Sequence, residues 1–199
     1  MTVASSIRSR SSSAATSADL NADANSTTLM VRDYDLAATL TSGQVFRWRL
    51  ENDAWHGMIG QRRVRLRADA SVIHAETIEP TTDWKWLKEY LQTEVELAHV
   101  LATFPDDEPL RAAVSACRGL RVLRQEPWEC LASFILSSTK QIGQIQQIVA
   151  LLCDRFGEPL PAAPGFRPAH TFPAAARLAG ATESELRACK MGFRAPYLL

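Results

Sequence analysis

Residues 138–141, Ser-Thr-Lys-Gln, combine a positive charge with the pattern of a helix N-terminus. Ser138 followed by Gln141 has the spacing of a capping box, in which both side chains bond backbone N–H groups of the first turn. Unpaired N–H groups and the helix dipole attract anions, so Lys140 could contact a phosphate there. A solvated lysine beside an ordinary capping box explains the same residues equally well.

The distribution of charge also bears on an anionic partner. The 199 residues have no net charge, but residues 1–109 hold 11 basic and 16 acidic side chains, whereas residues 110–199 hold 11 basic and six acidic ones. Of the 22 basic residues, 18 are arginine, whose planar fork matches phosphate geometry. The basic second half favours a polyanion partner. Pairing between the two halves is an equally good interpretation.

Other common chemistries find no support in the sequence. The four cysteines form no CxxC pair or Cys/His cluster, and the four histidines are isolated from any acid or cysteine at a ligand or catalytic spacing. We therefore expect no metal site, cofactor or disulfide framework, and we interpret the histidines as structural or surface residues. No apolar run approaches the ~20 residues that a membrane span needs. The four cysteines are Cys117, Cys130, Cys153 and Cys189, and the four histidines are His56, His74, His99 and His170.

The elements that must position these residues fall into three segments. Residues 1–28 form a Ser/Thr/Ala-rich tract without aromatic residues, for which we predict a disordered tail. Residues 29–78 show the alternation of strands. In 44–50, Phe46, Trp48 and Leu50 point one way, and turn signals follow at 52–53, 60–61 and 69–71. The pattern predicts an antiparallel meander with one apolar face.

Two sets of side chains in the predicted sheet have structural interpretations. We assign Phe46 and Trp48 to its core. The arginines of the strands share a face, which we interpret as solvated and paired with the acidic segment 76–108. These arginines are Arg47, Arg49, Arg63, Arg65 and Arg67.

Helical periodicity begins after Pro80. Thr82 is the expected N-cap of a helix with Trp84, Leu87, Tyr90 and Leu91 on one stripe. A short helix over 95–102 follows, and Pro109 is expected at the start of another, which ends at Gly119.

A second group of helices is predicted from Pro127 onward. The first has Trp128, Leu131, Ala132 and Ile135 on one face, and we assign Trp128, Phe134 and Ile135 to the core. The next buries Ile142, Ile145, Val149, Leu152 and Phe156. Thr182 and Glu185 cap a further helix that ends at Gly192, and Pro196 is expected to open one more. The sequence thus predicts an α+β protein. It comprises the tail 1–28, a sheet domain with helices over 29–118, and the first part of an all-helical domain over 119–199.

Four stretches, in order and separation, resemble the 8-oxoguanine DNA glycosylase family of base-excision repair. They are SGQVFRW at 42–48, LRVLRQEPWECL at 120–131, SFILSS at 133–138 and MGFRAPY at 191–197. The resemblance covers residues 29–199. It implies an N-terminal antiparallel sheet similar to half of the TATA-binding protein, followed by a helix-hairpin-helix glycosylase domain.

The resemblance implies a role for Gly43. In the family the glycine at this place brings a backbone carbonyl against the N7 proton of 8-oxoguanine, which guanine lacks, so that one hydrogen bond discriminates. We interpret Gly43 as the lesion-recognition residue. A glycine required only for a positive φ is the alternative.

The resemblance also implies that Phe193 is an aromatic wedge inserted beside the flipped nucleotide and that Arg194 contacts the base left unpaired. The alternative is a helix C-cap, with Gly192 at C′ and Phe193 as its hydrophobic contact. Both can hold together.

One stretch departs from the family pattern. In the family, an Asn-rich stretch at this place fills the space that the flipped base leaves. Here that place holds Ser138, Thr139, Lys140 and Gln141, and Gln144 stands where the family has a cytosine-reading arginine. We expect the four residues 138–141 to contact DNA. The departure at 144 bears on the preference for cytosine opposite the lesion.

The family's chemistry uses a nucleophilic lysine, a nearby aspartate and a Gly-rich hairpin beyond the wedge. We expect none of them within this sequence, and hence no catalytic residue. The resemblance implies that the complete protein excises 8-oxoguanine from duplex DNA and cleaves the abasic site, acting as a monomer. A non-catalytic DNA-binding module or an inactive fragment is the alternative. The expected location is the bacterial nucleoid, or the nucleus or mitochondrion of a eukaryote.

Overall fold

The structure, a computed structural model, describes residues 25–199. Most of the tail expected at 1–28 lies outside this range. Strand β1 (Ser26–Met30) begins earlier than the expected boundary, because it pairs with β5 (Val72–Thr77) from Ser26 opposite Glu76 to Met30 opposite Val72. The sheet domain therefore starts at residue 26.

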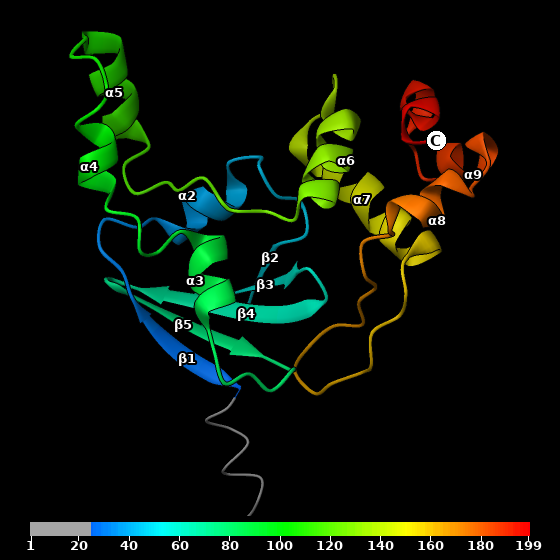
Figure 1. The fold of residues 1–199 in the computed structure, drawn as a ribbon, viewed down its shortest axis with the longest axis horizontal. Coiled ribbons are helices and arrows are strands. Elements are labelled where there is room, and N and C mark those ends of the chain that lie inside the picture. The colour runs from blue at the N-terminus through cyan, green and yellow to red at the C-terminus, as the bar shows by residue number, and fades with distance from the viewer. Residues whose placement is uncertain (1–24) are drawn as a thin grey trace, which may run out of the picture.

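The sheet formed by the described residues has five antiparallel strands in the order β1-β5-β4-β3-β2. The remaining strands are β2 (Arg49–Glu51), β3 (Ala54–Ile59) and β4 (Arg62–Asp69). Val64, Leu66, Ile73 and Ala75 are fully buried on one side, under α2 and α3 (Figure 1). The α+β class and the meander with one apolar face are confirmed.

The strand expected over residues 44–50 is wrong for most of its length. Only Arg49 and Leu50 belong to β2, and residues 44–48 are irregular. Val45 and Trp48 enter the core of the sheet domain, whereas Phe46 enters the core of the helices and Leu50 is exposed. The alternation of apolar residues reflects a segment that passes between two cores.

Between residues 25 and 126 the structure has four helices. They are α2 (Leu36–Thr41), α3 (Lys85–Leu91), α4 (Leu97–Leu101) and α5 (Glu108–Ala116). Helix α2 lies where only strands were expected. The Asp35 carboxylate caps it by accepting from the Ala38 N–H at 2.8 Å, and it buries Leu36 and Leu40.

Helix α3 buries Leu87, Tyr90 and Leu91 as predicted, but Thr82 is not its cap. Trp84 is the N-cap residue, and the Asp83 carboxylate accepts from the Lys85 N–H at 2.8 Å. Helix α5 begins with Pro109 in its first turn as predicted, after the N-cap Asp107.

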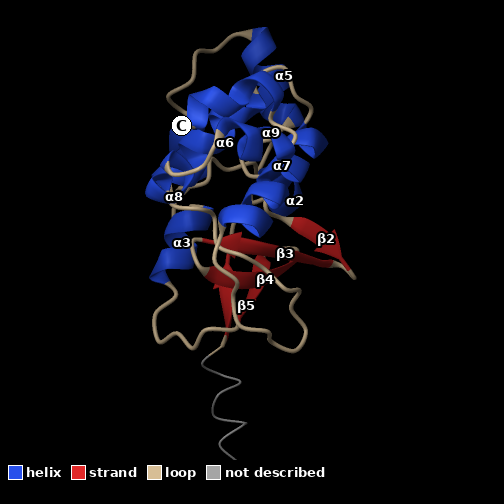
Figure 2. Ribbon diagram, turned by 90° about the vertical axis from the view of Figure 1, so that its right-hand side faces the viewer, coloured by secondary structure: helices blue, strands red, loops and turns tan. Residues whose placement is uncertain are grey.

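The second part is helical. It contains α6 (Pro127–Ser137), α7 (Ile142–Phe156), α8 (Ala175–Ala179), α9 (Glu183–Ala188) and the 3₁₀ helix η1 (Gly192–Leu198). Together they enclose a core of their own, and as a group they lie on one side of the strands (Figure 2).

The structure tests the core positions and ends predicted for these helices. Ala132 is buried, and Trp128 and Ile135 pack against the helical core. Phe134 is 75% exposed and Ile142 is 42% exposed, so both are wrong as core residues, and Leu131 is 53% exposed although it shares the predicted face. The cap of α9 by Thr182 is confirmed, although the helix ends at Ala188 rather than at 192. Pro196 does not open a helix, because it lies inside η1.

The change from one core to the other comes later than the expected boundary at 118. Leu123 belongs to the sheet core, and the Arg124 N–H donates to the Tyr90 carbonyl of α3 at 3.0 Å. Residues 119–126 therefore run along the sheet domain, and the helical part begins at Pro127.

The long connection from α7 to α8 returns to the sheet (Figure 1). It covers the arginine face, where Arg63 is only 3% exposed and donates to the Pro161 carbonyl. Ion pairs with the acidic segment are present as expected, from Arg65 to Glu76 and from Arg63 to Glu79. The expectation of a solvated face is wrong at Arg63, because this connection covers it. It is also wrong at Arg47, whose side chain is 9% exposed and pairs with Glu129 rather than with the segment 76–108.

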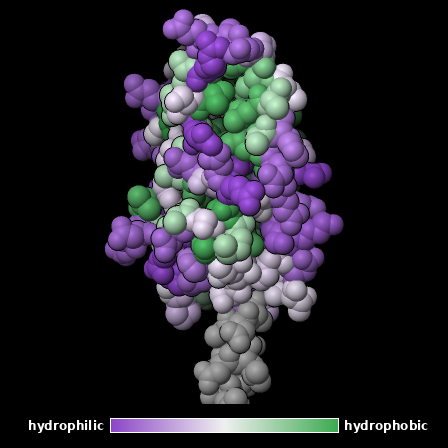
Figure 3. Space-filling model, turned by 90° about the vertical axis from the view of Figure 1, so that its left-hand side faces the viewer, coloured by the Kyte–Doolittle hydropathy of each residue, from purple (hydrophilic) through white to green (hydrophobic). Residues whose placement is uncertain are grey.

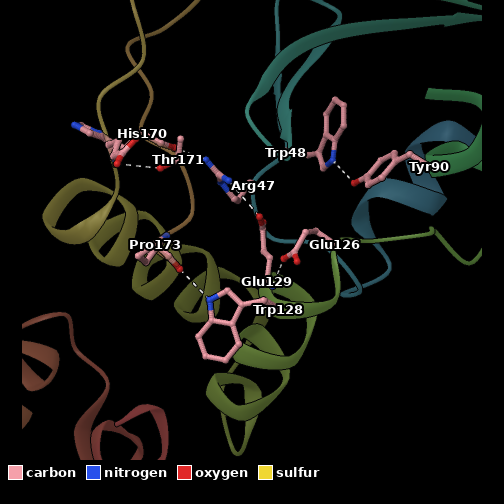
Figure 4. Close-up of polar contacts among 10 residues, drawn as sticks. Arg47, Trp48, Tyr90, Glu126, Trp128, Glu129, His170, Thr171 and Pro173 are labelled. Carbon is pink, nitrogen blue, oxygen red and sulfur yellow. Dashed lines mark hydrogen bonds and ion pairs between the residues drawn. The ribbon is translucent and has the colours of Figure 1, made fainter. Parts of the chain in front are cut away.

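Arg47 joins the two parts of the molecule (Figure 4). Its guanidinium lies 3.3 Å from the Glu129 carboxylate of α6 and donates to the His170 carbonyl at 2.5 Å. Beside it, the Trp48 Nε1–H donates to the Tyr90 hydroxyl at 2.9 Å. The segment after Gly43 is thus held by both cores.

Helices α4 and α5 project from one end of the sheet domain (Figure 1). Apolar side chains gather in a hollow on this face (Figure 3), with a cavity of about 420 Å³ lined by Leu101, Phe104 and Val114 among others. No helix within residues 25–199 is long and apolar enough to cross a membrane.

Candidate nucleic-acid interface

Three segments that are distant in sequence meet at the N-terminal end of α7. They are the loop that carries Gly43, the α6–α7 turn of residues 138–141, and the start of η1. A Cβ atom on Gly43 would lie 3.2 Å from Cδ1 of Ile142, the first residue of α7. Arg194 donates to the Ser138 carbonyl and to Thr139 Oγ1. The structure therefore brings the expected lesion-recognition residue close to the expected DNA-contacting turn.

The loop at Gly43 has a conformation that favours glycine. The φ angle of Gly43 is +85°, in the region that L side chains rarely adopt. The interpretation that this glycine supplies a positive φ is confirmed, and it is compatible with a carbonyl that must approach a ligand closely.

Gln44 holds this loop in place, a role that the sequence pattern did not indicate. Its side-chain NH₂ donates to the carbonyls of Thr39 at 3.0 Å and Arg121 at 2.8 Å. Its Oε1 accepts from the Leu123 N–H at 2.8 Å. Two of these partners are 77 and 79 residues away in sequence, so local pattern carries no signal for them. One side chain ties the Gly43 loop to the strand-like segment 121–123.

The α6–α7 turn differs from the expected capping box. Ser138 is the C-cap of α6, and Gln141 is the N-cap of α7, with Gln144 Oε1 accepting from the Gln141 N–H at 3.1 Å. The box is displaced by three residues because α6 continues to Ser137 and leaves room for only a tight turn. Gln144, which was considered only for its departure from the family pattern, has a structural role.

Thr139 takes a left-handed conformation in this turn, with φ of +55°. Such a conformation is unfavourable for a β-branched residue unless the surroundings hold it. Ser138, Thr139 and Gln141 are exposed, and Lys140 is half-buried. Within residues 25–199 the Lys140 ammonium group has no hydrogen-bond or ion-pair partner, and Lys140 directly precedes Gln141, the N-cap residue of the 15-residue helix α7. Both features favour an anion at this place.

Phe193 and Arg194 are neighbours in sequence but differ strongly in solvent exposure. Phe193 is 55% exposed, whereas Arg194 is 2% exposed. The Arg194 guanidinium carbon lies 4.2 Å from the centre of the Phe193 ring. The interpretation of Gly192 as a helix C-cap is wrong, because α9 ends four residues earlier and Gly192 begins η1.

The electrostatics of these segments are one-sided. Residues 130–153 and 186–199 contain no aspartate or glutamate, and they carry Lys140, Arg187, Lys190 and Arg194. Arg194 makes no ion pair with any carboxylate among residues 25–199; its hydrogen-bond partners are two carbonyls and a hydroxyl. Arg187 is paired with Glu183 at 2.6 Å, whereas Lys140, Lys190 and Arg194 have no carboxylate partner among the described residues. A local excess of positive charge of this kind favours a polyanion.

Comparisons with known proteins agree with the fold and the segments above. Residues 27–131 match the sequence profile of the 8-oxoguanine DNA glycosylase N-terminal domain. The chain is 33% identical over 174 residues to the N-glycosylase/DNA lyase OGG1 of Arabidopsis thaliana, and 33% identical over 181 residues to the N-glycosylase/DNA lyase of Saccharomyces cerevisiae. These alignments cover 83% and 82% of this chain but 47% of either relative. The chain thus spans about half the length of the curated relatives it matches.

Solved structures give the same result. The 8-oxoguanine glycosylase/lyase of Clostridium acetobutylicum, without ligand, superposes with a TM-score of 0.79 at 25% identity, over 87% of this chain and 61% of that protein. The structure of MBOgg1 in complex with a low-affinity DNA ligand gives a TM-score of 0.79 at 27% identity, over 87% of this chain and 60% of that one.

Proposed function

Because this chain belongs to the 8-oxoguanine DNA glycosylase family, we propose that it recognises 8-oxoguanine in duplex DNA during base-excision repair. The observation that carries the proposal is the convergence of the Gly43 loop, the 138–141 turn and Phe193 at one end of α7. A glycosylase must hold an extruded base and fill the space that the base leaves. These segments supply a backbone surface for the base and an exposed aromatic ring for the stack.

We assign the roles as follows. The Gly43 carbonyl accepts the N7 proton of the oxidised base, and Phe193 enters the stack beside it. Lys140 and the N-terminus of α7 bind a phosphate. Ser138, Thr139 and Gln141 contact the DNA from the exposed side of the turn.

We further propose that the whole protein excises the base and cleaves the abasic site, and that residues 25–199 provide recognition rather than the attacking amine. A nucleophilic lysine requires desolvation or a neighbouring group that lowers its pKa. The sequence has four lysines, and all lie within residues 25–199. Lys85, Lys88 and Lys190 are exposed or partly exposed and Lys140 is half-buried, so no lysine is buried.

Binding to a labelled duplex with one 8-oxoguanine opposite cytosine, compared with guanine at the same place, tests recognition. Gly43→Ala should remove the preference for the oxidised base, since a side chain would crowd Ile142 and displace the carbonyl. Gly60→Ala is the matched control, because Gly60 also has a positive φ, of +58°, but lies in open space in the β3–β4 turn. Equal affinity of the unaltered protein for the two duplexes would contradict the proposal.

Borohydride trapping separates recognition from chemistry. Incubation of the chain with the oxidised duplex and borohydride should leave no covalent adduct. An adduct would show that an amine in this chain attacks the sugar, and Lys140→Arg and Lys190→Arg would identify it.

A further inference from the structure

Arg194 connects two of the segments that the proposed function places on DNA. Its Nη2 donates to the Ser138 carbonyl and to Thr139 Oγ1, the latter at 2.6 Å. Its Nη1 donates to the Met191 carbonyl at 3.4 Å. One guanidinium thus joins the start of η1 to the α6–α7 turn, across 55 residues of sequence.

The environment of this guanidinium is unusual for a residue that reads a base. Arg194 is 2% exposed, and its Nε has no partner among the described residues. The ring of Phe193 lies over the cation, with 4.2 Å between the guanidinium carbon and the ring centre. Contact with a DNA base would require Arg194 to give up these hydrogen bonds and the stacking.

The hydrogen bond from Arg194 to Thr139 stabilises an unfavourable backbone conformation in the α6–α7 turn. The left-handed φ of Thr139, +55°, is strained for a β-branched residue, and its hydroxyl is the side-chain acceptor of Arg194. The Lys140 N–H bonds to the Ser137 carbonyl at 3.0 Å within the same turn. The cation therefore holds the turn in a conformation that the local sequence does not favour.

We propose that Arg194 is a positioning residue that locks the 138–141 turn to the Phe193 wedge, so that the two DNA-contacting segments form one rigid unit. This inference rests on the proposed function for its effect on DNA, but the lock itself is a property of the free protein. It differs from the role that the resemblance implies for Arg194, which is direct contact with the base opposite the lesion.

The lock can be tested first without DNA, by amide hydrogen exchange on the full chain. Thr139→Val keeps the shape and the β-branch but removes the acceptor, and Thr139→Ser keeps the acceptor. Thr139→Val should increase exchange within 192–198 by about tenfold, since a hydrogen bond to a charged group is lost. Thr139→Ser should leave that segment as it is. Unchanged exchange there in Thr139→Val would overturn the inference.

The effect on DNA is measured with 2-aminopurine placed beside the 8-oxoguanine, because its fluorescence rises when a wedge unstacks it. Phe193→Ala should abolish the rise. Thr139→Val and Arg194→Lys should each reduce affinity and signal about tenfold, and the double variant should lose no more than Arg194→Lys alone. Thr139→Val, at an exposed position, keeps the test valid even where Arg194→Lys impairs folding.

The opposite base distinguishes positioning from direct reading. If Arg194 is a lock, Arg194→Lys should reduce the signal by the same factor with each of the four bases opposite the lesion. A loss confined to one opposite base would overturn the inference in favour of direct reading. If the unaltered chain does not bind the oxidised duplex at all, the proposed function fails, while hydrogen exchange still decides the lock.

Discussion

The contact between Gly57 and Trp48 gives the sharpest test of how the sheet domain holds the segment after Gly43. Gly57 lies in the middle of β3, and a Cβ atom there would lie 2.2, 2.3 and 2.7 Å from three atoms of the Trp48 ring. Ordinary contact begins near 3.4 Å, so the ring would have to retreat by about 1.2 Å. Trp48 is 3% exposed and bonds the Tyr90 hydroxyl at 2.9 Å, so it has little room to do so.

We predict that Gly57→Ala destabilises the protein by about 1–3.5 kcal/mol, once the backbone gain of alanine is subtracted from the packing cost. Overpacking of a close-packed site costs about 1–3 kcal/mol, and strain or loss of the buried Trp48–Tyr90 hydrogen bond adds about 1 kcal/mol. The strand backbone itself favours alanine by about 0.5–1 kcal/mol, so any loss reports the clash. Urea unfolding followed by circular dichroism measures the change.

A double-mutant cycle attributes the cost. In the background of Trp48→Leu, which removes the ring, Gly57→Ala should cost less than half as much as in the unaltered protein. Gly60→Ala, with φ of +58° and no neighbour within 4 Å, should show only the backbone cost of about 1 kcal/mol. An equal cost of Gly57→Ala in both backgrounds would refute the packing argument.

Three further predictions concern charge and pH. Lys140→Ala should reduce the slope of log affinity against log salt by about 1 when 8-oxoguanine DNA is bound, and an unchanged slope would mean that Lys140 contacts no phosphate. Burial raises the pKa of the Glu129 carboxyl although Arg47 lies 3.3 Å away. Its contribution to stability is therefore full below 4.5, its ordinary pKa, and is lost as pH rises through the folded pKa. Glu129→Gln should abolish that loss in urea midpoints measured from pH 4 to 8, and an unaltered profile would contradict it. Hydrogen bonds from Thr182 lower the pKa of Glu185, so its carboxylate stabilises the folded protein above pH 4.5, and this stabilisation is lost as pH falls through the folded pKa. Glu185→Gln should flatten the acid limb of the same curve of urea midpoint against pH. A steeper acid limb would contradict the direction of the pKa shift.

Local sequence determines the elements whose signals are short in range. The capping pair Thr182 and Glu185 acts within one helical turn, and the buried stripe of Leu87 and Leu91 follows the helical period. The strands from 54 to 77 alternate with turn residues between them, and the sheet forms there as predicted. The α+β class and the family both follow from such signals.

Local sequence fails where a segment serves two cores. The alternation of 44–50 is typical of a strand, but Val45 and Phe46 point into different cores. The sequence did not predict helix α2, because six residues are too few for a helical repeat of apolar residues to be distinguished from the alternation of a strand. Phe134 has the spacing of a core residue and is nevertheless exposed, since periodicity indicates a face and not what covers it.

The site divides in the same way. Residue types and their order along the chain are enough to single out Gly43, residues 138–141 and the Phe193–Arg194 pair. Only the tertiary fold brings Gly43 against Ile142 and buries Arg194 on Thr139, because both contacts join residues more than 50 positions apart. The burial of a cation cannot be inferred from its neighbours in sequence, since it depends on acceptors that another segment supplies. The sequence alone therefore singled out the candidate residues of the site, and the tertiary structure decided that Arg194 faces the protein rather than solvent.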